Sequence, residues 1–147
     1  MIVIEYPDNV HSIRGSAEAA VILDPVRKKW VRLSPEEWVR QNFLQYFIRI
    51  LHYPAALISV EKEIRVGELR KRYDIVVYDQ DTKPWLLMEC KQPSEEMGQA
   101  VLDQALRYHI GVPVRYLVIS NGNDTYAWEK QEGRLTLLEA LPPWQNG

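Results

Sequence analysis

The 147-residue sequence predicts an α/β (α+β) fold in which helices flank a central β-sheet. A helix-period apolar pattern follows Ser34, and the chain changes to short β-rich segments after Pro54. Helical spacing returns after Pro93 and gives way to further strand-like segments. We expect one domain over residues 1–147, because a chain of this length with 46% apolar residues can bury one sizeable core.

The first helix is predicted to begin at Ser34, which suits an N-cap, with Pro35 at the first helical position. Glu37 stands three residues after the cap, as in a capping box. Apolar residues recur at helical spacing up to the break at Tyr53-Pro54, and these are Val39, Phe43, Phe47, Ile50 and Leu51.

Short apolar or alternating segments bounded by turn residues predict the strands. We expect a hairpin before the first helix, a three-stranded meander after it, and a fourth strand with a closing hairpin at the end. A second helix is expected over about residues 95–110, because Pro93-Ser94 precedes it and Gly111 ends it. The expected strands are residues 20–23, 30–33, 60–66, 73–78, 85–91, 116–120, 125–129 and 134–138.

The net charge of −2 argues against a broadly basic protein that coats nucleic acid, so any DNA contact must be local. Two basic clusters are candidates for this contact, although each could also be a solvated turn. The first comprises Arg27, Lys28, Lys29 and Arg32, and the second, which we expect to bind DNA, comprises Arg65, Arg70, Lys71 and Arg72.

The sequence predicts a cytoplasmic protein without a membrane partner. Its longest apolar runs fall far short of the ~18 to 20 residues that span a bilayer. The first ten residues contain an acidic Glu5 and lack the basic region of a secretory signal. The lone Cys90 excludes an intramolecular disulfide and a multi-cysteine metal site, which fits a reducing compartment.

Strand alternation places candidate catalytic residues together. Glu89 and Lys91 should project from one face of the third meander strand, while Met88 and Cys90 project from the other. A hairpin of this length can bring Asp74 opposite Glu89 or Lys91. Two carboxylates and an ammonium would then converge.

This constellation suits phosphodiester hydrolysis, because carboxylate oxygens hold Mg²⁺ and an ammonium can orient the attacking water. Without metal the two carboxylates should repel, so we expect Asp74→Asn to match or exceed the wild type in melting temperature. The alternative is a cross-strand ion pair on a solvated sheet face, worth ~0.2 to 1 kcal/mol.

The second helix carries a stripe at helical spacing through Met97, Val101, Gln104 and Tyr108. Gln104 occupies a position on this stripe where an apolar residue is expected. Its partners could be a metal-bound water, a phosphate or Lys91. Alternatively, Gln104 bonds a neighbouring backbone group, and Tyr108 fills the core with its hydroxyl at the rim.

Asp74, the triplet Glu89-Cys90-Lys91, and the pair Gln104 and Tyr108 together resemble the PD-(D/E)xK nuclease superfamily. More narrowly, the chain is similar to the N-terminal domain of type I restriction enzyme R subunits over about residues 20–130. Six segments in the same order carry this resemblance: SPEEWVRQ (34–41), YPAALISVEKEI (53–64), KRYDIVVYD (71–79), MECKQPS (88–94), DQALRY (103–108) and ISNG (119–122).

The resemblance implies a restriction-endonuclease-like core with a mixed sheet and an Mg²⁺-dependent DNA endonuclease activity, with Mn²⁺ as a possible substitute. Asp74, Glu89 and the backbone carbonyl of Cys90 would bind the metal, and Lys91 would be catalytic. Gln104 and Tyr108 match an additional helix motif of the family. An acid of the first helix often joins such sites, and Glu37 is the expected candidate ahead of Glu36, although Glu37 could instead be only a capping-box residue. The superfamily's name has a proline before the first acid, where this chain has Tyr73.

The 147 residues contain no glycine-rich loop ending in Gly-Lys-Ser/Thr, so we expect them to bind no nucleotide cofactor. Other restriction-modification subunits are possible partners. The three histidines, His11, His52 and His109, show no ligand-like spacing and are expected to be structural or exposed. The alternative to a nuclease is a module of the same fold that binds DNA or protein without cutting, and a purely structural interaction domain is the third reading.

Overall fold

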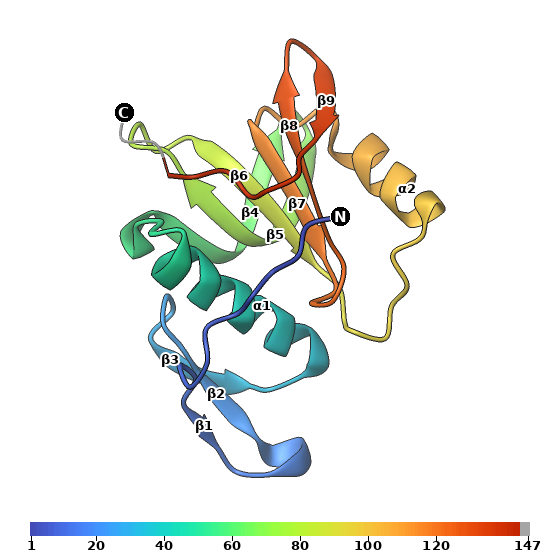
Figure 1. Cartoon of the computed structure of the whole chain (residues 1–147). Coiled ribbons are helices and arrows are strands. Elements are labelled where there is room, and N and C mark those ends of the chain that lie inside the picture. Colours follow the sequence, from blue (N-terminus) through green and yellow to red (C-terminus); the bar gives the residue numbers. More distant parts are fainter. Residues whose placement is uncertain (145–147) are drawn as a thin grey trace.

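The computed structural model describes residues 1–144, which form two β-sheets with helices against them (Figure 1). A small sheet lies at one end of the molecule, and a six-stranded sheet forms its centre. The helix α1 (Pro35–Gln45) lies between the two sheets, and α2 (Gln99–His109) lies beside the large one. The predicted α+β architecture with a mixed central sheet flanked by helices is confirmed.

The small sheet has the order β1-β2-β3 and is antiparallel. The large sheet has the order β4-β5-β6-β7-β8-β9, in which β6 and β7 are parallel and the other neighbours antiparallel. The crossover through α2 makes this parallel pairing possible. The strands are β1 (Ile13–Arg14), β2 (Val21–Asp24), β3 (Lys29–Arg32), β4 (Ile58–Val66), β5 (Leu69–Tyr78), β6 (Pro84–Cys90), β7 (Tyr116–Ser120), β8 (Thr125–Gln131) and β9 (Arg134–Leu137).

The helix α1 begins as the sequence predicts. The Oγ atom of Ser34 accepts a hydrogen bond from the backbone N–H of Glu37 at 3.0 Å, and Pro35 occupies the first turn. After Gln45 the chain continues as a π-helical turn, η2 (Tyr46–Ile50), so the predicted helical segment is wider over its last five residues.

Among residues 1–144, no helix is long and apolar enough to cross a membrane.

The two helices cover opposite faces of the large sheet. On one face, α1 packs Phe43 and Leu44 against a cluster that includes Ile75 and Met88. On the other face, Leu102 of α2 packs against a cluster that includes Val76, Leu87, Leu117 and Ile119. Burial on both faces explains why β7 contains buried residues only.

The start of α2 differs from the prediction. The helix begins at Gln99, with Gly98 as its N-cap, rather than near Glu95. The carbonyl of Glu95 accepts a hydrogen bond from the Nδ2 atom of Asn121 at 2.8 Å, so the side chain after β7 holds this segment outside the helix. Residues 91–98 therefore form a loop that leads from the end of β6 to α2 (Figure 1).

The buried stripe of α2 also differs from the prediction. Leu102 and His109 are the buried residues of the helix, whereas Gln104 and Tyr108 are exposed. The predicted stripe and the observed one both follow a helical period. The sequence misleads here because the polar His109 is buried, whereas the apolar Val101 is only partly buried. Gln104 is therefore not a polar residue in the core, and its partners need not be buried groups.

Candidate active site

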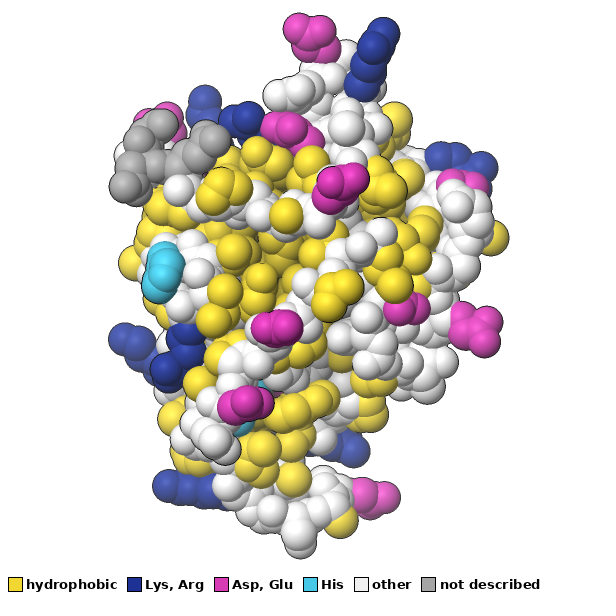
Figure 2. All heavy atoms as spheres, viewed as in Figure 1, with side chains coloured by type: hydrophobic (Ala, Val, Ile, Leu, Met, Phe, Trp, Pro, Cys, Tyr) yellow, Lys and Arg dark blue, Asp and Glu magenta, His cyan; other side chains and the backbone are white. Residues whose placement is uncertain are grey.

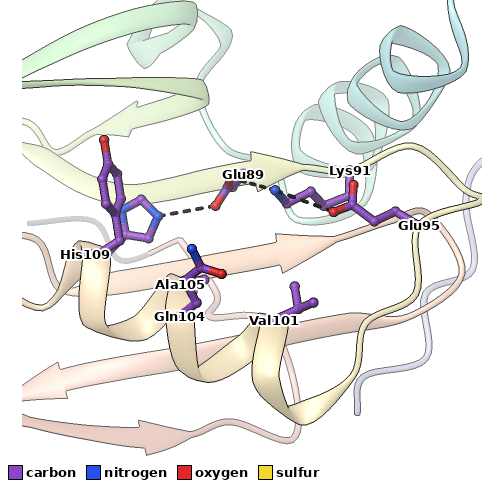
Figure 3. A pocket seen from close by; sticks show the side chains of 8 residues that line it. Glu89, Lys91, Glu95, Val101, Gln104, Ala105 and His109 are labelled. Atoms are coloured by element: carbon purple, nitrogen blue, oxygen red, sulfur yellow. Dashed lines mark hydrogen bonds and ion pairs between the residues drawn. The ribbon is translucent and has the colours of Figure 1, made fainter.

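The end of β6 and one side of α2 enclose a cavity of about 300 Å³ (Figure 3). Glu89 and Lys91 enter it from β6 and the residue after it, and their side chains form an ion pair of 3.1 Å between Oε1 and Nζ. Lys91 also lies 3.9 Å from a carboxylate oxygen of Glu95. The cavity is lined by Glu89, Lys91, Glu95, Val101, Gln104, Ala105, Tyr108 and His109.

The charges in this cavity stabilise one another. A hydrogen bond from His109 lowers the pKa of Glu89, and Lys91 adds to this effect against the opposing effect of burial. Burial alone would lower the pKa of Lys91, but the neighbouring Glu89, with help from Glu95 and Asp74, raises it. Glu89 is therefore an anion and Lys91 a cation at neutral pH.

Asp74 is held from two sides at the other face of the sheet. Its Oδ1 atom accepts a hydrogen bond of 2.8 Å from Nη2 of Arg40, and its Oδ2 atom accepts one of 2.7 Å from the backbone N–H of Cys90. Asp74 lines a second cavity of about 490 Å³ together with Glu36, Arg40, Glu61, Arg72 and Tyr73.

Strict alternation along β5 breaks at Asp74. Tyr73 and Val76 pack in the cluster beneath α2, while Ile75 packs in the cluster beneath α1. The register places Asp74 opposite Glu61 of β4, a residue with a left-handed φ of 54° that interrupts the ladder. The expectation that Asp74 and Glu89 share one sheet face is therefore wrong, because this distortion turns Asp74 toward α1.

The two acids nevertheless lie at one opening between strands. The β5–β6 ladder ends at the pair Ile75 and Met88. Beyond this pair, the carboxylate of Asp74 accepts a hydrogen bond from the backbone N–H of Cys90. Continuing the same register places Asp74 beside Glu89. Lys91 pairs with Glu89 at 3.1 Å, and the charges of Glu89 and Asp74 both contribute to raising its pKa. The structure thus brings Glu89 and Lys91 into contact and places Asp74 at the adjoining strand opening, turned toward α1.

Arg40 is a functional candidate that the sequence did not reveal. Only 5% of its surface is exposed, and its Nη1 atom donates to Glu37 at 3.0 Å and to Glu61 at 3.2 Å. Burial opposes its charge, but the hydrogen bond to Asp74 and the neighbouring carboxylates raise its pKa. An arginine beside the core residue Val39 is a weak sequence signal, because buried charges need partners that only the fold brings together.

The two acids at the start of α1 have different surroundings. Glu37 is buried, and its carboxylate accepts hydrogen bonds from Arg27, Arg40 and Gln41 at 3.0 to 3.2 Å. It does not complete the expected capping box. Glu36 is exposed and lines the Asp74 cavity, where partial burial and the charge of Asp74 raise its pKa. Of these two acids, Glu36 lines the Asp74 cavity, whereas the expected candidate Glu37 is bonded to Arg27, Arg40 and Gln41.

His109 is the second residue that the sequence did not single out. It ends α2, is 6% exposed, and lies with Nε2 3.3 Å from Oε2 of Glu89. Figure 3 shows its ring directed at Glu89, and Gln104 pointing from α2 toward the strand that carries Glu89. The signal that could have identified His109 is its position seven residues after Leu102, which places both on one buried stripe.

In the second basic cluster, three of the four cationic side chains are exposed to solvent. The side chains of Arg65, Arg70 and Arg72 are 65% to 70% exposed, with carboxylates of Glu63 or Glu61 nearby. Lys71 is buried instead, donates to the carbonyl of Tyr108, and lies over the Tyr108 ring. We therefore keep only the three arginines as candidate DNA contacts.

The first basic cluster is partly a structural element. Arg27 forms ion pairs with Asp24 at 2.8 Å and with Glu37 at 3.0 Å, and these pairs tie the β2–β3 turn to α1. Figure 2 shows that the basic side chains visible in its view are scattered around the periphery. The face seen in Figure 2 therefore carries no continuous basic patch.

The donors near the strand opening are of the kind that Mg²⁺ uses. Residues 1–144 contain no group of three or more His, Cys, Asp or Glu side chains that could hold a metal ion. Mg²⁺ needs no such cage, because it keeps several waters and binds through one or two carboxylates together with substrate phosphates. Two carboxylates lie at this opening, and each is paired with a cation of the chain: Glu89 with Lys91, and Asp74 with Arg40.

The burial of Cys90 separates its side chain from this chemistry. The residue is 2% exposed, and burial raises the pKa of its thiol well above the usual range. The residue contributes to the site through its backbone, since its N–H fixes Asp74.

One sequence family matches most of the chain. The profile of the family described as type I restriction enzyme R protein N terminus matches residues 35–142, from α1 to the segment after β9. A search of curated proteins finds no match. The matched range includes all residues of the two cavities around the strand opening. Because the match covers far more than half of the chain, this protein belongs to the type I restriction enzyme R protein N-terminal family.

Proposed function

We propose that the chain is a magnesium-dependent nuclease domain that hydrolyses phosphodiester bonds in DNA. The observation that carries this proposal is the opening between β5 and β6, where Glu89 and Lys91 stand beside Asp74. Membership of a restriction-enzyme family supports the choice of DNA as substrate. Other restriction-modification subunits are the proposed protein partners, and no nucleotide cofactor is proposed.

In this proposal, Asp74, Glu89 and the Cys90 carbonyl hold Mg²⁺, and Mn²⁺ can take its place. The ion would supply Lewis-acid polarisation of the scissile phosphate and stabilise the leaving oxygen. Lys91 remains an ammonium at neutral pH, so it orients the attacking water by hydrogen bonding and does not remove its proton. Glu36, which lines the Asp74 cavity, is the proposed additional acid.

Gln104 and Tyr108 have proposed roles on the α2 side of the site. Both line the cavity with Glu89 and Lys91, and both are exposed. The amide of Gln104 can donate to a phosphate oxygen or to the attacking water. The backbone carbonyl of Tyr108 accepts a hydrogen bond from the ammonium of Lys71, and this bond connects the end of α2 to β5.

The test is a nicking assay on supercoiled plasmid with Mg²⁺, comparing the wild type with Lys91→Ala. Lys83→Ala removes an exposed lysine from the β5–β6 turn and is the matched control. We expect Lys91→Ala to lower the nicking rate by roughly 100-fold or more, in the range seen when one catalytic donor is removed. A gel-shift titration with Ca²⁺, which can fill the site without supporting turnover, should show unchanged DNA affinity in this variant.

The second candidate is a module that binds DNA without cutting it. One observation favours it, namely that the chain's own cations already pair with both carboxylates, Arg40 with Asp74 and Lys91 with Glu89. If wild type and Lys91→Ala both bind DNA and neither nicks it, this candidate replaces the nuclease. Equal nicking rates in the two proteins would contradict the role assigned to Lys91.

A further inference from the structure

A chain of hydrogen bonds runs from the β5 residue before Asp74 to Glu89. The hydroxyl of Tyr73 lies 2.8 Å from Nδ1 of His109, and Nε2 of His109 lies 3.3 Å from Oε2 of Glu89. Tyr73 and His109 are both buried, at 1% and 6% exposure. Both ring nitrogens of His109 therefore have partners, and neither depends on solvent.

The chemistry of the two ends fixes the direction of these bonds. An ionised Glu89 can only accept, so Nε2 of His109 carries the proton and donates to it. Burial raises the pKa of Tyr73, so its hydroxyl stays protonated and can donate to a bare Nδ1. These directions place the proton of the His109–Glu89 hydrogen bond on Nε2.

The two oxygens of Glu89 consequently have different partners. Oε2 faces His109, while Oε1 faces the ammonium of Lys91 at 3.1 Å. Figure 3 shows His109 and Lys91 on opposite sides of the Glu89 carboxylate. With two fixed partners, the carboxylate cannot rotate without losing one of them. Its plane is thus defined before any ligand enters the cavity.

We propose that His109 is a positioning residue that, supported by Tyr73, orients the Glu89 carboxylate for divalent-cation binding. This inference rests on the proposed function, since it assumes that Glu89 binds the metal. His109 acts through Glu89 and touches neither metal nor DNA in this role. Groups that hold a metal ligand in this way commonly change metal affinity by 10- to 100-fold when they are removed.

The first measurement is independent of metal and activity. Ring ¹⁵N shifts of His109 in the wild type, recorded at about pH 8 to favour the neutral ring, report which nitrogen carries the proton. We expect a proton on Nε2. A bare Nε2 would overturn the proposal, because such a ring cannot donate to Glu89.

The second measurement is Mn²⁺ binding by calorimetry for the wild type, His109→Ala, His109→Gln and Tyr73→Phe. We expect His109→Ala to weaken binding by about tenfold or more. His109→Gln should restore most of the affinity, because its amide N–H can replace Nε2–H. Tyr73→Phe should have a smaller effect in the same direction. A purely structural His109 would lower the melting temperature in the Ala and Gln variants alike and leave Mn²⁺ affinity unchanged.

The outcomes separate this inference from the proposed function. If the wild type binds Mn²⁺ and His109→Ala binds it equally well, the positioning role is overturned while the metal site stands. If Mn²⁺ does not bind the wild type, or binds Glu89→Gln equally well, the metal site at Glu89 is overturned and the positioning role with it. Loss of affinity in His109→Ala with rescue in His109→Gln supports both.

Discussion

Arg40 of α1 holds Asp74 of β5 through a hydrogen bond of 2.8 Å between Nη2 and Oδ1. This contact joins the first helix to the strand opening and places a guanidinium beside the first acid of the site. Asp74 also accepts the backbone N–H of Cys90, so both of its oxygens have partners without metal. The repulsion expected between two unpaired carboxylates is therefore offset by the chain itself.

The first prediction follows from this contact and reverses the expectation drawn from the sequence. Asp74→Asn should destabilise the metal-free protein by about 1–3 kcal/mol, because the new amide NH₂ faces a donor and the charge-assisted bond is lost. Urea unfolding in EDTA measures this difference. An unchanged or raised free energy of unfolding would show that Asp74 repels its surroundings more than Arg40 attracts it.

The second prediction separates the two acids at the start of α1. Glu37→Gln should cost about 1–3 kcal/mol of stability, because Glu37 accepts hydrogen bonds from two buried or half-buried arginines. Glu36→Gln should leave the stability nearly unchanged and lower the nicking rate, because Glu36 lines the Asp74 cavity. Unfolding curves and nicking rates of both variants decide the question. A catalytic loss in Glu37→Gln without a loss of stability would reverse this assignment.

The large features of the fold could be predicted from the sequence because local patterns determine them. Ser34 and Pro35 mark the start of α1, and the alternation and punctuation after Pro54 mark the strands. The extra strand β1 was not predicted, because two exposed residues carry no periodic signal. The predicted start of α2 was wrong, because the true start depends on a long-range hydrogen bond between Asn121 and Glu95.

The candidate site was only partly predictable for a related reason. Glu89 lies on β6 and Lys91 directly follows the strand, so continued alternation places their side chains together. Asp74 could not be oriented in this way, because its direction depends on the left-handed Glu61 in the neighbouring strand. Arg40 and His109 acquire their partners through tertiary packing, which no local spacing reveals.

The third prediction concerns pH. A hydrogen bond from His109 and the charge of Lys91 lower the pKa of Glu89 below its ordinary value of 4.5 in the folded state. Glu89 therefore stabilises the fold above that value, and this contribution disappears as the pH falls through the folded-state pKa. Unfolding free energies between about pH 6 and pH 3 should fall less steeply for Glu89→Gln than for the wild type. Glu68→Gln, which removes an exposed carboxyl of the β4–β5 turn, is the control.

The fourth prediction tests where DNA binds. Arg70 and Arg134 are exposed arginines near hairpin turns, but Arg70 lies on β5 near one edge of the large sheet and Arg134 on β9 at the other. Arg70→Glu and Arg134→Glu change the net charge equally, so any difference between them reflects position. If Arg70 contacts a phosphate, its variant should bind DNA more weakly, and the slope of log K against log salt should decrease by about one unit.

Gel-shift titrations of both variants at several salt concentrations, with Ca²⁺ present, measure these slopes. Arg70→Glu should also recover nicking at high DNA concentration, because Arg70 lines neither cavity and the acids remain in place. Equal losses in the two variants would mean that affinity follows net charge alone. A loss confined to Arg134→Glu would move the DNA to the β9 edge, away from the opening that holds Asp74, and the phosphate could then not reach Lys91.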